Sequence, residues 1–317
     1  NGTILPGGDD EITVGLPDHW RLSGVLEPDG GSAVEEPRAA VRAALASPVG
    51  ALRLSDLVSE AASVALVVDD ASRPTPVDVI FPAVLEELER AGVDNERVTL
   101  VTALGVHRPM TRAEVEGRLG GPLPEGVRWE NHDCDDDDVL DALGVTERGT
   151  PVLVNKLISR ADVVVSIGCI EPHIIASFGG GYKNLVPGVA GRQTIAHNHT
   201  LNCTPETFNM VGQSIDRNPM RLDLEEAGGM VKGDVFIVNA ILNSRQELVR
   251  VVAGDPIEAH RRGVGDSQRL YGARVPAPAD VVITDSHPMD QDLRQGVKWL
   301  AHTIRAVRRG VVRIPLV

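Results

Sequence analysis

One stretch of the chain, residues 168–188, gathers side chains that could carry out chemistry. It reads Gly-Cys-Ile-Glu-Pro-His at its start, with Glu171 and His173, and later passes through three successive glycines to Lys183. The apolar, β-branched run at 162–167 just before it predicts a buried strand of a parallel sheet. Because chemistry in open α/β sheets gathers beyond the carboxyl ends of the strands, these side chains are placed for function. The loop lacks the Gly-Lys-Ser/Thr of a P-loop and the G-x-G-x-x-G of a dinucleotide site, so nucleotide binding is not predicted.

Other predicted strands also end in polar residues. The strands expected at 64–68, 98–102 and 281–284 lead to Asp70 and Arg73, to His107, and to Gln295 and Lys298, respectively. If all four strands are parallel in one sheet, their carboxyl ends lie on one edge and can line one cleft. Two imidazoles that face such a cleft would suit opposed acid and base roles.

Each of these features also has a structural interpretation. Asp70 and Arg73 could pair with each other or cap the helix that begins near Thr75. A histidine in a loop often makes only a structural hydrogen bond. The rings of His197 and His199 would face the same way on an extended segment, as two metal ligands do, but no third ligand lies at tight spacing. The acidic cluster at 133–138 fits either a solvated turn or a hard-metal site.

Composition excludes several classes of partner. Thirty-one Lys and Arg against 45 Asp and Glu give a net charge of −14, which repels nucleic acid and anionic membranes. Aromatic residues make up only 3% of the chain, so few side chains could stack on bases. No apolar run approaches the ~18 residues of a membrane span. The three widely separated cysteines, Cys134, Cys169 and Cys203, predict buried apolar fillers in a cytoplasmic protein.

The order of the predicted elements indicates an α/β protein. Helical and extended patterns alternate, as in βαβ units, with a helix expected at 77–88 and a capping box of Thr111 and Glu114 opening another. Later strands are expected at 235–240 and 249–252.

A Pro-rich segment at 275–279 predicts a domain boundary. We therefore expect two domains with mostly parallel sheets and flanking helices, and an active site in the interdomain cleft. Residues 1–274 would form the N-terminal α/β catalytic domain that carries the cofactor. Residues 275–317 would form the start of a second α/β domain, present here only in truncated form.

Taken together, the motifs resemble those of the nickel-pincer lactate racemase family of 2-hydroxyacid racemases and epimerases. The match runs from about residue 60 to residue 300, and several separate motifs occur in the family's order. These are Asp70–Pro76, Gly105–Thr111, Glu171–Gly188, Thr194–His199 and Pro288–Lys298.

The resemblance implies a cofactor and the residues that hold it. This cofactor is a nickel-pincer nucleotide, a pyridinium-derived group that holds nickel through carbon and two sulfurs. Lys183 would carry it through a thioamide bond, and His199 would supply the fourth nickel ligand. Gly180 and Gly181 would let the planar group lie close to the backbone. Asp70 would orient one of the groups in this site.

The resemblance also implies a reaction. His107 and His173 would act as acid and base on opposite faces of the substrate carbon, while hydride leaves for the cofactor and returns. Arg73, Gln295 and Lys298 would hold the substrate carboxylate.

Arg294 stands where the lactate enzymes have an aromatic residue. Unless it turns outward to pair with Asp292, it predicts a 2-hydroxyacid more polar than lactate. Alternatives are a lactate racemase proper, a metal-dependent hydrolase that uses His197 and His199, or a small-anion binding protein. We expect no nucleic-acid or membrane partner, and the sequence does not predict an oligomeric state.

Overall fold

The computed structural model describes residues 2–7, 10–26, 31–285, 301 and 303–316. The chain divides into two compact units: residues 30–271 form the larger, whereas residues 1–29 and 272–317 together form the smaller. The break at 272 lies close to the Pro-rich boundary predicted at 275. The first 29 residues group with the C-terminal segment, whereas the sequence-based division placed them with the N-terminal domain.

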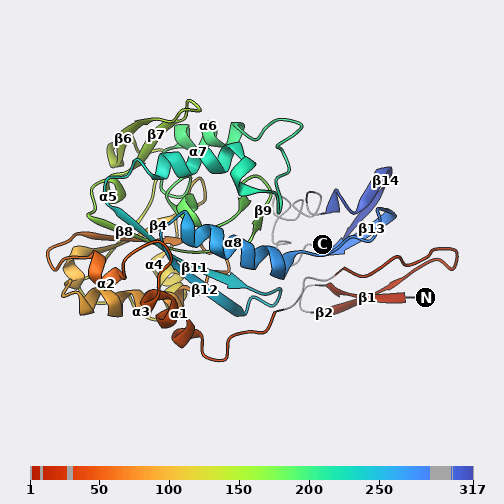
Figure 1. Ribbon diagram of the computed structural model, residues 1–317, viewed down its shortest axis with the longest axis horizontal. Helices are drawn as coiled ribbons and strands as arrows, with labels where there is room; N and C mark the ends of the chain where they lie inside the picture. The colour runs from red at the N-terminus through yellow and green to blue at the C-terminus, as the bar shows by residue number, and fades with distance from the viewer. Residues whose placement is uncertain (1, 8–9, 27–30, 286–300, 302, 317) are drawn as a thin grey trace. The chain divides into compact units, whose positions relative to one another are not determined.

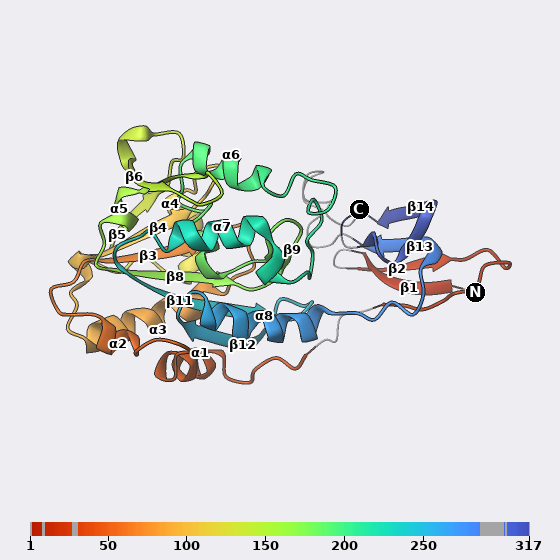
Figure 2. The same ribbon diagram turned by 45° about the horizontal axis from the view of Figure 1, so that its top comes forward.

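The larger unit is built on a six-stranded sheet (Figures 1 and 2). Neighbouring strands in this sheet are parallel, except that β11 and β12 at one edge are antiparallel. In spatial order the strands are β12 (Leu248–Gly254), β11 (Asp234–Leu242), β8 (Val163–Cys169), β3 (Val64–Asp69), β4 (Val98–Ala103) and β5 (Arg128–Asn131). All residues of β3, β4 and β8 are buried, because helices cover both faces of the sheet, and this explains their continuous apolar sequences.

Helices and a hairpin cover the two faces of this sheet, as Figures 1 and 2 show. One face packs on α1 (Pro37–Ala46), α3 (Val77–Arg90) and α4 (Arg112–Leu119), with the short α2 (Leu54–Leu57) beside them. The other packs on the β6–β7 hairpin (Leu140–Val145, Pro151–Asn155), α5 (Lys156–Ser159), α6 (Arg192–Thr200), α7 (Pro219–Gly228) and α8 (Glu258–Tyr271). The predicted α/β class, with a mostly parallel sheet and flanking helices, is confirmed.

The capping box predicted from the sequence is present at the start of α4. The hydroxyl of Thr111 accepts from the backbone N–H of Glu114 at 3.3 Å, and the Glu114 carboxylate accepts from the backbone N–H of Thr111 at 2.7 Å. Two N–H groups that have no partner within the helix are thereby satisfied. Short 3-10 helices occur at Asn95–Arg97, Asp137–Val139, Gly181–Asn184 and Ile215–Arg217.

The smaller unit contains two two-stranded sheets. Strands β1 (Gly2–Gly7) and β2 (Asp10–Gly15) are antiparallel, and β13 (Ala279–Asp285) runs parallel to β14 (Val307–Leu316). The strand predicted at 281–284 therefore exists but is not part of the six-stranded sheet. The expectation that four strand ends share one sheet edge is wrong for this strand, because it pairs with a segment near the end of the chain.

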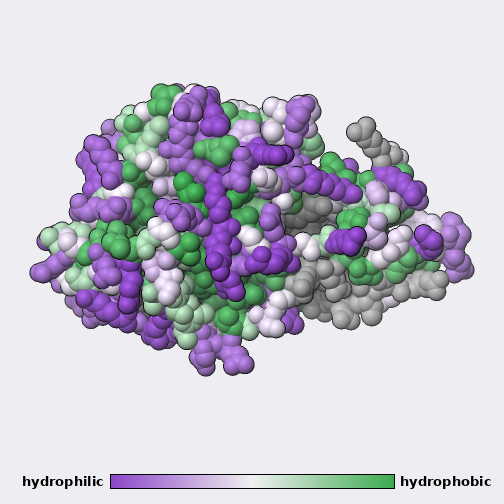
Figure 3. All heavy atoms as spheres, viewed as in Figure 1, coloured by the Kyte–Doolittle hydropathy of each residue, from purple (hydrophilic) through white to green (hydrophobic). Residues whose placement is uncertain are grey.

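Figure 3 shows hydrophilic and hydrophobic residues interspersed on the face in view, as is usual for a folded protein surface. Among the described residues, no helix is long and apolar enough to cross a membrane.

Candidate active site

The sheet has its topological switch point between β3 and β8. After β3 the chain continues to β4 and β5 on one side, and it then returns to place β8 on the other side of β3. At such a point the loops that leave neighbouring carboxyl ends diverge, and ligands of open α/β sheets bind in the crevice between them. The loop after β3 carries Asp70 and Arg73, and the loop after β8 carries Glu171 and His173.

An ion pair joins these two loops. Nη1 of Arg73 lies 2.9 Å from Oε1 of Glu171, and the side chains are only 21% and 15% exposed. Burial by itself would lower the pKa of Arg73, but the negative charges of Glu171, Asp69, Asp70 and Cys169 together outweigh it and raise that pKa. The suggestion that Asp70 and Arg73 pair with each other is wrong, because each has a partner on another loop.

Asp70 instead orients His107, which follows β4. Nδ1 of the imidazole lies 2.6 Å from Oδ2 of Asp70, whose other oxygen accepts from the backbone N–H of Ser72 at 2.7 Å. Burial raises the pKa of Asp70, but the hydrogen bonds from His107 and Ser72 outweigh it and bring the pKa to about 2. The carboxylate is therefore ionised at neutral pH and fixes the ring of His107, which remains 43% exposed.

His173 lies on a small hairpin formed by β9 (Pro172–His173) and β10 (Ser177–Phe178). Its Nδ1 accepts from the backbone N–H groups of Ile175, at 3.3 Å, and Ala176, at 3.1 Å. Asn218 braces the hairpin by donating to the carbonyl of Ile175 at 2.7 Å and to the hydroxyl of Ser177 at 2.9 Å.

The glycine run that follows is packed against protein. Gly180 and Gly181 have φ angles of 74° and 63°, a region that L side chains rarely adopt. A Cβ at Gly180 would lie 2.6 Å from Oδ1 of Asn239, and one at Gly181 would lie 3.0 Å from the ring of His260. Protein atoms therefore already require glycine here. Lys183 follows on the short 3-10 helix that this turn begins.

Two residues that the sequence analysis missed hold this turn in place. Arg221 of α7 is completely buried and donates to the carbonyl groups of Gly180, at 3.2 Å, and of Phe178. Nε2 of His260, on α8, lies 2.8 Å from the carbonyl oxygen of Gly179. Burial lowers the pKa of Arg221 to about 10. Nothing in the local pattern indicated these roles, because an arginine on an amphipathic helix usually faces solvent.

His199 lies on α6, whereas the sequence analysis had considered His197 and His199 on an extended segment. That interpretation is wrong, because positions two apart on a helix point to different sides. Nδ1 of His197 lies 2.8 Å from the hydroxyl of Thr150. Nδ1 of His199 lies 2.8 Å from the carbonyl oxygen of Ile195, one turn earlier, and can only donate to it.

The donor set around His199 fits a metal-bound cofactor anchored at Lys183. Because Nδ1 of His199 carries the proton, the lone pair of Nε2 is available to a metal, as in most metal-binding histidines. Burial lowers the pKa of His199, and the positive charge of Lys183 lowers it further. The ring of His199 is therefore neutral at neutral pH, and Lys183, the proposed anchor, lies close enough for its charge to affect the pKa of the ring.

A buried ion pair supports the loop that carries Asp70 and Arg73. Arg118 of α4 donates to Oδ1 of Asp69 at 2.5 Å and to the carbonyl of Arg73 at 2.9 Å. The two side chains are only 17% and 8% exposed. Burial raises the pKa of Asp69 to about 6, although the charge of Arg118 opposes this.

Replacing Arg118 with Met should lower the free energy of unfolding by ~3 kcal/mol at about pH 7.5, because it leaves a buried carboxylate unpaired. Asp69 keeps its proton to higher pH in the folded chain than in the unfolded chain, so its contribution to stability falls as pH rises from about 4 to 6. The loss in Arg118→Met should accordingly shrink at about pH 5. Urea unfolding at both pH values measures it. Arg112→Met, on the same helix but with its side chain 65% exposed, should cost far less. Equal losses in both variants would contradict the argument.

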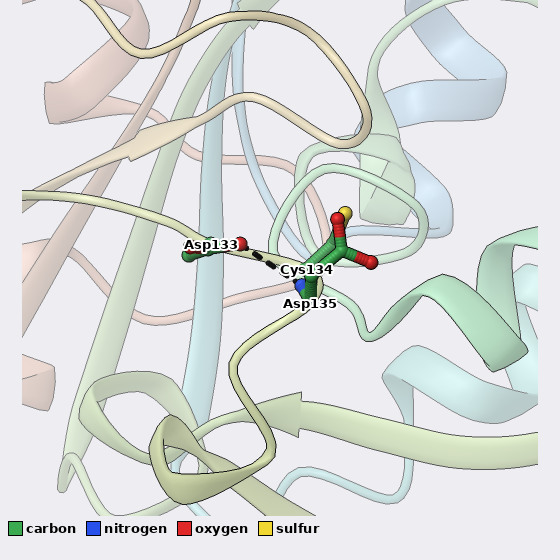
Figure 4. Close-up of side chains that lie close together, drawn as sticks. All are labelled: Asp133, Cys134 and Asp135. Atoms are coloured by element: carbon green, nitrogen blue, oxygen red, sulfur yellow. Dashed lines mark hydrogen bonds between the residues drawn. The ribbon is translucent and has the colours of Figure 1, made fainter.

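The acidic cluster forms a turn. The carboxylate of Asp133 accepts from the backbone N–H of Asp135 at 2.9 Å (Figure 4), and the carboxylate of Asp135 pairs with Arg192. Asp133 and Asp135 thus each have a partner within the protein, while one ligand atom each of Asp133, Cys134 and Asp135 lie within 4.8 Å of one another. Cys134 and Cys169 are buried, as predicted. Cys203 is exposed, so the prediction of a buried apolar filler is wrong for this residue.

Three predicted substrate-binding residues, Arg294, Gln295 and Lys298, lie outside the described residues. The predicted cleft between domains depends on them, and it stays a prediction.

Comparison with known proteins identifies the family. The model of the lactate racemase N-terminal domain matches residues 8–209, more than half of the chain. A lactate racemase of Thermoanaerobacterium thermosaccharolyticum is 31% identical over 98% of this chain and 72% of its own length. This chain belongs to the lactate racemase family. As a family member it is an isomerase of the racemase and epimerase class.

A second lactate racemase and two solved structures are also similar to this chain. The lactate racemase of Lactiplantibacillus plantarum is 30% identical over 82% of this chain and 61% of its own length. The structure of the T. thermosaccharolyticum lactate racemase apoprotein matches with a TM-score of 0.89 and 29% identity, over 99% of this chain and 74% of that one. A Thermotoga maritima protein that is 20% identical shares the fold, with a TM-score of 0.71 over 91% of this chain and 72% of that one.

Proposed function

We propose that this member of the lactate racemase family interconverts the two configurations of a 2-hydroxyacid by proton-coupled hydride transfer. The observation that carries the proposal is the gathering of Arg73, His107 and the His173 hairpin on the loops that follow β3, β4 and β8. The C2 hydrogen of a 2-hydroxyacid is very weakly acidic, and its removal as hydride avoids a carbanion. Two imidazoles that exchange the hydroxyl proton suit a reaction that runs in both directions.

The cofactor proposed for this site is a nickel-pincer nucleotide. Lys183 would hold it covalently, Nε2 of His199 would ligate its nickel, and the group would supply a hydride acceptor that returns the hydride to either face. The residues of the chain do the remaining work. Arg73 would bind the substrate carboxylate with the N–H groups that Glu171 does not occupy. Asp70 would fix the imidazole of His107 for proton exchange.

Two alternatives considered from the sequence receive less support. A metal-dependent hydrolase that uses His197 and His199 would need both rings at one metal, but the two residues are two positions apart on α6 and point to different sides of the helix. A non-enzymatic anion-binding protein would explain Arg73 but not the Asp70–His107 pair. We retain a cytoplasmic location as part of the proposal, since all three cysteines are free.

The test of this function is a racemisation assay on purified protein, started separately from each configuration of several 2-hydroxyacids, together with metal analysis. Nickel and sulfur above background, with racemisation in both directions, are the expected results. Zinc in place of nickel, or protein that contains nickel but never changes substrate configuration, would refute the proposal.

Replacing His199 with Ala should lower the nickel content by more than about ten-fold, because the variant loses a direct ligand and not only an outer contact. His197→Ala is the matched control, two residues away on the same helix, and should keep its nickel. Nickel per protein in purified, folded samples is the measurement. Equal nickel in the two variants would show that His199 is not a ligand.

The substrate is proposed to be more polar than lactate, such as a hydroxydicarboxylate or a sugar acid. Arg73 and Lys298 account for one carboxylate, so Arg294 is left for a second anionic or polyhydroxy group. Arg294→Ala should lower the specificity ratio for such acids over lactate by about ten-fold or more, as the ~1.5–3 kcal/mol of a charge-assisted hydrogen bond implies. Arg305→Ala, at an exposed position, is the control. If the native protein prefers lactate and Arg294→Ala leaves the specificity ratio unchanged, the alternative of a lactate racemase proper would be favoured instead.

A further inference from the structure

The Nδ1 atoms of the two proposed catalytic imidazoles have opposite kinds of partner. Nδ1 of His107 faces Oδ2 of Asp70 at 2.6 Å. An ionised carboxylate has no proton to donate, so Nδ1 must supply the hydrogen of this bond. The neutral ring of His107 therefore carries its proton on Nδ1, and its Nε2 has a lone pair that can accept a proton.

His173 shows the reverse arrangement. Its Nδ1 faces two backbone N–H groups, from Ile175 and Ala176, at 3.3 and 3.1 Å. A backbone N–H can only donate, so Nδ1 has to be the unprotonated nitrogen. The neutral ring of His173 therefore carries its proton on Nε2.

The hairpin that presents these N–H groups is held from several sides. Ser177 has a φ of 63°, and the carbonyl of Ile175 accepts from both Asn202, at 2.6 Å, and Asn218, at 2.7 Å. The fully buried Arg221 donates to the carbonyl of Ala176 at 3.4 Å. Moving the N–H groups away from His173 would disturb these contacts. The tautomer of His173 is thus set by the fold of its own loop.

We propose that the substrate-free protein holds His107 and His173 in opposite tautomers, and that in this state His173 serves as a neutral hydrogen-bond donor. Resting on the proposed function, this makes Nε2–H of His173 a group that polarises the substrate oxygen, while Nε2 of His107 is ready to accept the hydroxyl proton. The two imidazoles, which the proposed function treats as equivalent bases, therefore have different roles in the substrate-free protein.

The inference has a structural consequence for the reverse direction. Before His173 can accept a proton at Nε2, its own proton has to move to Nδ1. That requires the N–H groups of Ile175 and Ala176 to turn away, because two donors cannot share one hydrogen bond. The hairpin at 172–178 must therefore rearrange when His173 becomes the base, whereas the Asp70–His107 pair needs no such change.

The test is the ring nitrogen spectrum of the full chain, ¹⁵N-labelled at histidine, without cofactor or substrate and at about pH 8. Signals are assigned with the variants His107→Gln and His173→Gln. We expect His173 to show an unprotonated Nδ1 and a protonated Nε2, and His107 to show the opposite pattern. In Asp70→Asn, the tautomer preference of His107 should weaken while that of His173 is unchanged.

A protonated Nδ1 on His173, or the same tautomer in both rings, would overturn the inference. Because the spectra need neither cofactor nor turnover, they are independent of the racemisation assay. Opposite tautomers in a protein that never racemises a hydroxyacid would refute the proposed function and leave this assignment intact.

Discussion

Replacing Lys183 with Ala should abolish covalent attachment of the cofactor and lower racemisation by about 10³-fold or more. A covalent anchor makes binding intramolecular and fixes the position of the group, and both effects are lost without the amine. Lys183 follows a turn that Arg221 and His260 hold rigidly, and its charge acts on His199. The intact mass of purified protein and a chiral assay measure the two losses.

The control for Lys183 is Lys232→Ala, at an exposed position in the same unit. The chain has four lysines, at 156, 183, 232 and 298, so peptide mapping can assign an adduct to one of them. Lys232→Ala should keep both adduct and activity. An adduct that persists in folded Lys183→Ala, or full activity of that variant with added cofactor, would refute the attachment.

Replacing either His107 or His173 with Ala should lower racemisation by ~10²–10⁴-fold from both configurations of the substrate. Every turnover that inverts the carbon uses both rings, so neither direction should be spared. Nickel content should change little, since neither ring is proposed to touch the metal. Initial rates from each pure enantiomer, with nickel measured on the same samples, test this.

The control for the histidine pair is His19→Ala, at an exposed position in the smaller unit. It should racemise at the native rate. Near-native racemisation by His173→Ala would remove that residue from the mechanism. Loss of nickel in parallel with activity would point instead to damage of the cofactor site.

Some of the site could be predicted because it depends on local pattern. The buried strands β3, β4 and β8 are apolar throughout, and their ends marked Asp70, His107 and His173 as residues at one sheet edge. The motif order then indicated the family, which the comparisons confirm. The three predicted residues at 294, 295 and 298 are not tested by the described part of the chain.

Other features of the site depend on contacts between residues far apart in sequence. The ion pair of Arg73 with Glu171 spans 98 positions, and no local pattern could have selected it over a pair with Asp70. The buried role of Arg221 arises only because α7 packs beside the glycine turn. The error at His197 and His199 came from the assumed period, since an extended strand repeats every two residues and a helix does not.

The sequence by itself determined the α/β class, the positions of the main strands, the capping box at Thr111 and the family. These follow from periodicity, propensity and motif order, which are properties of short segments. Only the tertiary structure decided that β13 lies outside the six-stranded sheet, that β3 and β8 form the switch point, and which atoms face each Nδ1 of His107 and His173. Those facts depend on strand pairing and on a choice among several hydrogen-bond partners, and such choices are settled by the packing of the whole unit.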